Sequence, residues 1–157
     1  MSADDELLLW SGGGLSELGA GAVDWVQVRG PNSYDVDAPI AWTGESVLAR
    51  GWQQVDHRLF TFLAQWDGAS GAWELLPQAP RDIDYGFVWA DGRLLVLGAD
   101  LIYDIDTRTW WEMTLPDSVD DYGDVAVWAG DRLFVWGGAS DKGTPAHEVA
   151  FVLTPDL

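Results

Sequence analysis

Pairs of aspartates recur along this chain, and their carboxylates have the clearest potential for chemistry. The pairs are Asp35 with Asp37, Asp82 with Asp84, and Asp120 with Asp121. The first two pairs stand seven and five residues before a tryptophan, and Asp121 keeps the seven-residue spacing. Calcium takes about six to eight oxygen ligands, so carboxylates from several converging loops would suit it. We therefore take Asp37, Asp84 and Asp121 as candidate calcium ligands; no other cofactor is expected.

The same aspartates allow other interpretations. They suit the Lys and Arg side chains of a cationic partner, or, as paired carboxylates, the acid and base of a glycoside hydrolase or lyase. They are also ordinary turn residues, because Asp bonds its own backbone. No residue pattern singles out one catalytic carboxylate, so we expect a binding role and no catalytic residues.

Trp52 is a separate candidate for contact with a partner. It lies beside Gln53 and Gln54, outside the positions that repeat along the chain. Aromatic side chains dominate binding hot spots, which favours an exposed contact role. The alternative is simple packing within a loop.

The elements that carry these residues are visible in a repeat. Trp42, Trp89 and Trp128 each stand nine residues before a glycine, in the segments AWTGESVLARG, VWADGRLLVLG and VWAGDRLFVWG. Each segment has two apolar stretches around a turn containing Gly, which predicts a β-hairpin. The segment from Asp5 matches the one from Asp131, so a fourth copy is present without its first strand. We expect the three repeated tryptophans to be core residues that pack repeat on repeat.

A second hairpin is predicted after each first one. Trp66 and Trp73 are separated by six residues, as are Tyr103 and Trp110, and a polar turn lies between each pair. Each unit therefore has four strands. Successive units start 47 and 39 residues apart, counted from Trp42 to Trp89 and from there to Trp128, which brackets the length of one propeller blade.

This pattern resembles the kelch repeat, as found in the central domain of galactose oxidase. Four hydrophobic residues, a Gly-Gly pair and an aromatic six residues before Trp are matched best by 133–138 and by Tyr103 with Trp110. Gly-Gly is lost at Gly51 and Gly98, and Trp66 replaces the usual Tyr. The resemblance implies an all-β propeller of four-stranded antiparallel blades that presents loops to protein partners.

The chain is expected to form a single propeller domain or partial propeller over residues 1–157, with approximate repeats 1–36, 37–80, 81–120 and 121–157. This amounts to about three and a half blades, fewer than the four or more of closed propellers. Open blade edges recruit other chains. We expect a second copy in a homodimer, the missing part of a longer chain, or an uncommon compact closure to cover them.

Composition excludes several classes of partner. The net charge is −18, from 26 acidic and 8 basic residues, with Lys142 as the single lysine. Nucleic acid and anionic membranes are therefore not expected as partners. There is no Cys, which excludes disulfides and thiolate chemistry. With no signal peptide or membrane span in the sequence, we expect a soluble chain in an unassigned compartment.

Together these patterns predict a non-catalytic binding or assembly module, a half-ring completed by self-association or bound to a protein through acidic loops. Two alternatives stay open: a propeller glycoside hydrolase or lyase, and a purely structural or engineered fragment.

Overall fold

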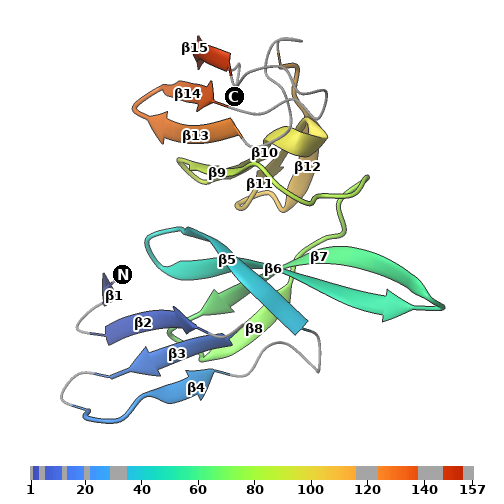
Figure 1. Cartoon of the computed structure of the whole chain (residues 1–157). Helices are drawn as coiled ribbons and strands as arrows, with labels where there is room; N and C mark the ends of the chain where they lie inside the picture. The colour runs from blue at the N-terminus through green and yellow to red at the C-terminus, as the bar shows by residue number, and fades with distance from the viewer. Residues whose placement is uncertain are drawn as a thin grey trace. The chain divides into compact units, whose positions relative to one another are not determined.

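The computed structural model describes residues 2–3, 6–11, 14–19, 22–28, 35–115, 124–137 and 147–153. These residues form four antiparallel sheets in which every strand pairs with its neighbours in sequence (Figure 1). The chain divides into two compact units, Met1–Ala79 and Pro80–Leu157. Each unit holds two of the sheets. The prediction of an all-β chain is confirmed.

The first sheet is a meander of four strands. They are β1 (Ser2–Ala3), β2 (Glu6–Ser11), β3 (Gly14–Leu18) and β4 (Val26–Val28). The expectation that this copy lacks its first strand was wrong, because Ser2 pairs with Leu7 and Ala3 with Glu6. Two residues are enough for this pairing, and so short a strand has no hydrophobic alternation that sequence reasoning could detect.

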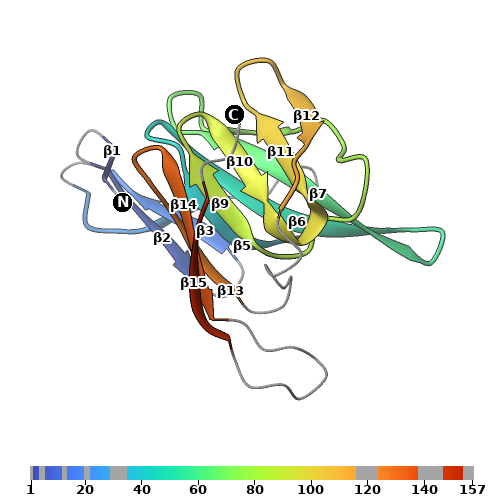
Figure 2. The same ribbon diagram turned by 90° about the horizontal axis from the view of Figure 1, so that it is seen from above.

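The second sheet contains the longest strands. They are β5 (Asp35–Trp42), β6 (Ser46–Val55), β7 (Arg58–Asp67) and β8 (Ala72–Leu75). β6 and β7 pair along their whole length, so residues 53–60 extend beyond the parts paired with β5 and β8 (Figure 2). We call residues 46–67 the long hairpin. Gly51, the last residue of the repeated segment that begins at Ala41, lies in the middle of β6.

The third sheet is more compact. Its elements are β9 (Phe87–Ala90), β10 (Arg93–Val96), the short 3-10 helix η2 (Leu97–Ala99), β11 (Leu101–Asp104) and β12 (Thr109–Glu112). The link that enters this sheet is fixed against η2, because the N–H of Leu97 donates to the carbonyl of Gly86 at 2.9 Å. Gly98 is required here, since a Cβ at this position would lie 2.8 Å from Cδ2 of the Tyr85 ring.

The fourth sheet has three strands among the described residues. They are β13 (Asp124–Ala129), β14 (Arg132–Gly137) and β15 (His147–Leu153). The register of β14 with β15 shifts between Val135 and Gly137. Between the pairs Val135–Phe151 and Gly137–His147, β14 advances by two residues and β15 by four, so β15 carries the extra residues.

The hairpin turns lie where the sequence predicts them. Asp91 and Gly92 both have positive φ angles, 43° and 89°, and Gly44 and Gly130 also have positive φ in their turns. Two consecutive residues with positive φ favour the two-residue turn that matches the twist of antiparallel strands. Glycine adopts this conformation without a steric penalty.

The six-residue spacing between aromatic residues has a direct structural cause. Trp66 pairs with Trp73 across β7 and β8, and Tyr103 pairs with Trp110 across β11 and β12. The rings of Tyr103 and Trp110 have centroids 4.9 Å apart and an interplanar angle of 47°. Directly opposed residues share one face of a sheet and stabilise it. The spacing therefore reflects a cross-strand aromatic pair on each side of a tight turn.

In the first unit the two sheets pack face to face. Leu15 of β3 is buried with Val47 of β6 and Trp66 of β7. The half-buried residues packed against this cluster come from both sheets and are Leu8, Val28, Trp42 and Trp73. The core of this unit thus lies between the first and second sheets.

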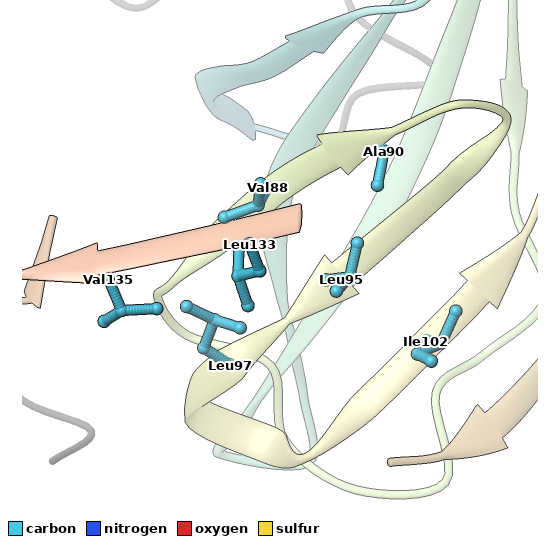
Figure 3. Packing of buried hydrophobic residues seen from close by; sticks show 7 residues of the cluster. All are labelled: Val88, Ala90, Leu95, Leu97, Ile102, Leu133 and Val135. Carbon is cyan, nitrogen blue, oxygen red and sulfur yellow. The ribbon is translucent and has the colours of Figure 1, made fainter. Parts of the chain in front are cut away.

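In the second unit the third and fourth sheets pack in the same way. Leu133 and Val135 of β14 point toward the third sheet, where they meet Leu95, Leu97 and neighbouring buried residues (Figure 3). At the rim of this contact the indole N–H of Trp128 donates to Oδ2 of Asp91 at 3.2 Å. A hydrogen bond thus ties the fourth sheet to a hairpin turn of the third.

The repeated tryptophans are less buried than the sequence predicted. Trp42, Trp89 and Trp128 are only half-buried. Among the described residues, the fully buried aromatic side chains are those of Trp66 and Tyr103, which lie two strands further along their sheets, on β7 and β11. The expectation that these tryptophans pack repeat on repeat is confirmed in part, because Trp42 and Trp128 pack against the two core clusters, but all three are only half-buried.

Candidate functional site

The first acidic pair lies on a strand and not in a loop between sheets. Asp35 and Asp37 belong to β5, and Asp35 is the register partner of Trp52 on β6. Two residues chosen separately from the sequence are therefore neighbours across a pair of strands. The side chains of Asp35 and Asp37 lie outside the described part of the structure, as do all atoms of Asp120 and Asp121.

The second acidic pair lies in the link between β8 and β9. Asp82 and Asp84 are exposed on either side of Ile83, which is buried. Arg81, the residue before them, forms a salt bridge with Glu112 at the end of β12. The buried Ile83 and the Arg81 ion pair hold this segment against the third sheet, so the two carboxylates project from an anchored link.

The prediction of a calcium site is not tested by this geometry. Among the described residues, no group of three or more His, Asp or Glu side chains is placed to hold a metal ion. Asp84 is the one predicted ligand whose side chain is described. The calcium hypothesis for Asp37, Asp84 and Asp121 stays a prediction.

Two other carboxylates have shifted pKa values, and both cap turns. The hydroxyl of Ser70 and then the N–H of Ala69 hold the pKa of Asp67 below its ordinary value. The N–H of Thr107 and then its hydroxyl do the same for the pKa of Asp104, with a smaller contribution from Arg93. Both groups are favoured in the charged form, the opposite of what a general acid needs.

The end of the long hairpin carries exposed apolar side chains. Trp52 is 43% exposed, and Val55 and Leu59 are exposed near the two-residue turn formed by Asp56 and His57. The alternative interpretation, in which Trp52 packs within a loop, was wrong, because Trp52 lies on β6. Its role in binding stays a prediction.

A larger apolar surface lies on the fourth sheet. Val125 pairs with Trp136, Val127 with Phe134, and Phe134 also with Val152. Residues paired in this way lie on one face of a sheet. We call these five residues the outer face of the fourth sheet. Val125 and Trp136 are 52% and 42% exposed, Val127 and Val152 are similarly exposed, and Phe134 is half-buried.

Sequence reasoning missed this face, although a signal was present. A sheet with one face in water alternates apolar and polar residues, whereas a strand covered on both faces is apolar throughout. The strands DVAVWA and RLFVWG contain almost no polar residue between their ends. They read as strands covered on both sides, yet in the described structure only the side with Leu133 and Val135 is buried.

No protein-family model matches the chain, and no curated protein matches it in sequence. None of the helical segments in the described residues is long and apolar enough to cross a membrane.

Proposed function

We propose that this chain is a non-catalytic assembly module, a kelch-like partial propeller that self-associates and binds a protein partner. The observation that carries the proposal is the repeated packing of consecutive sheets. In each unit a four-stranded meander places one face against the next meander, through Leu15, Val47 and Trp66 in one case and Leu95, Leu133 and Val135 in the other.

The burial pattern supports blades of a propeller. The second sheet buries Val47 on one face and Leu48 on the other, and the third buries Leu94 on one face and Leu95 on the other. Burial of both faces is what we expect of an inner blade in a propeller. The fourth sheet, in contrast, buries one face and exposes the apolar residues of the other.

The acidic residues suit the partner-binding part of the proposal. Asp82 and Asp84 project from an anchored link, and the net charge of −18 attracts cations at long range. A cationic protein segment would contact these residues, together with Asp35, Asp37, Asp120, Asp121 and the exposed ring of Trp52.

The test is the solution mass of the chain, measured by light scattering coupled to gel filtration, in chelator and again in calcium. We expect a dimer of twice 17.2 kDa in both buffers. A monomer at every concentration that also fails to retain basic peptides would contradict the proposal. A dimer that forms only in calcium would instead assign the carboxylates to a metal site.

A further inference from the structure

The outer face of the fourth sheet matches positions that are covered elsewhere in the same chain. Aligning the turns Asp91-Gly92 and Gly130-Asp131 puts Phe134 at the position of Leu95, and Trp136 at the position of Leu97. Leu95 and Leu97 are buried against Leu133 and Val135 of the following sheet. The outer face of the fourth sheet thus corresponds to the face of the third sheet that packs against the sheet following it.

The first sheet exposes the complementary half. The match between residues 5–10 and 131–136 puts Leu9 at the position of Val135. Val135 is fully buried against the preceding sheet, whereas Leu9 is 45% exposed. Leu8, at the position of Phe134, packs against the second sheet in the same way that Leu95 packs against the fourth. One chain therefore carries both halves of the same contact, each uncovered.

We propose that the outer face of the fourth sheet binds the first sheet of a second copy of this chain, with Leu9 packed against Val127 and Phe134. The contact continues the sheet-to-sheet packing seen inside each unit. It rests on the proposed function, whose self-association it specifies.

Two copies of the chain close a ring when this contact forms twice between them. The fourth sheet of each copy covers the first sheet of the other, which satisfies both exposed faces under two-fold symmetry. Two copies supply eight sheets, within the range of about four to eight blades seen in closed propellers. A heterologous contact that did not close would form filaments instead.

Single cysteines test the contact directly, since the chain has no Cys of its own. Val127→Cys and Leu9→Cys chains are mixed, one of them labelled with nitrogen-15, and joined with a short bismaleimide. Mass spectrometry then separates mixed pairs from self pairs. We expect mixed pairs to exceed both kinds of self pair by about tenfold or more, a preference of about 1.4 kcal/mol.

Ala69→Cys supplies the matched control, because Ala69 is exposed in the turn between β7 and β8. Because Ala69 belongs to neither face, mixed pairs of Val127→Cys with Ala69→Cys should stay at the level of random collision. Equal yields for Leu9→Cys and Ala69→Cys, or a predominance of Val127→Cys self pairs, would overturn the proposed contact. If either result accompanies a dimeric mass, the contact fails while self-association stands; a monomeric mass removes both.

Discussion

At the scale of single residues, Gly98 is the described glycine at which an added Cβ would come closest to other atoms, and those atoms belong to the Tyr85 ring. Tyr85 follows the acidic link, and its ring lies over the backbone of Gly98 in η2. Any side chain at position 98 would have to displace the ring. This contact therefore ties the segment that carries Asp82 and Asp84 to the core of the third sheet.

Gly98→Ala should destabilise the chain by about 1 to 3 kcal/mol, the usual cost of overpacking. The free energy of unfolding in urea is the measurement. Gly19→Ala is the control, because a Cβ at Gly19 meets nothing within 4 Å. Equal stability of the two variants would show that Tyr85 does not rest on Gly98.

Trp66→Ala should cost about 3 to 5 kcal/mol, because it removes a large buried side chain from between two sheets. Trp66 is 1% exposed, whereas Trp111 on β12 is 60% exposed. Trp111→Ala should therefore change the free energy of unfolding by no more than about 0.5 kcal/mol. Comparable losses in thermal and urea unfolding for both variants would contradict the assignment of Trp66 to the core.

At the scale of strands and turns, the hairpins could be predicted and their lengths could not. Turns such as Asp91-Gly92 have a local chemical signature, so the sequence locates them. The extension of β6 and β7 to Val55 and Arg58 ends in the turn of Asp56 and His57, which contains no glycine and so lacks the usual sequence signature of such a turn. The sequence also singled out Trp52 and Asp35 separately, but it did not predict that they pair across β5 and β6.

The candidate site divides in the same way. The acidic pairs were found because their spacing from the repeated tryptophans is regular. The outer face of the fourth sheet was missed because exposure is a tertiary property: Val125 and Ala126 are both apolar in sequence, and only packing decides which of them faces water. The uninterrupted apolar strands DVAVWA and RLFVWG were the signal of an apolar outer face. The repeated tryptophans instead favoured a core role for these strands.

The turn between β11 and β12 should make stability depend on pH. Hydrogen bonds from Thr107 lower the pKa of Asp104 in the folded state below its ordinary value of 3.8. The resulting stability is fully present above the unfolded pKa and is lost as the pH falls through the lower, folded pKa. Asp104→Asn should therefore be less stable than the wild type near pH 6, with the difference shrinking below pH 3.8.

The free energy of unfolding in urea, measured for both chains near pH 6 and again below pH 3.8, tests this pH dependence. Asn keeps a carbonyl acceptor for the Thr107 N–H, so the substitution isolates the contribution of the charge. A difference between Asp104→Asn and wild type that stays constant across the acidic range would show that the charge of Asp104 does not stabilise the turn.

At the scale of the whole molecule, assembly has to overcome charge. Each copy carries a net charge of −18, so two copies repel each other while their apolar faces attract. The Debye length falls from about 10 Å at 0.1 M salt to about 3 Å at 1 M. Raising sodium chloride over this range should lower the dissociation constant of the dimer severalfold, as measured by sedimentation. Weaker association in high salt would mean that opposite charges hold the copies together.

The central claim is that two copies close one compact ring, and small-angle X-ray scattering tests it most directly. A compact particle of two chains should have a radius of gyration of about 20 Å, compared with about 15 Å for one compact chain. We predict the larger value together with a mass of twice 17.2 kDa. A value near that of the single chain, or a dimer much more extended than the compact limit, would contradict closure through the outer face of the fourth sheet.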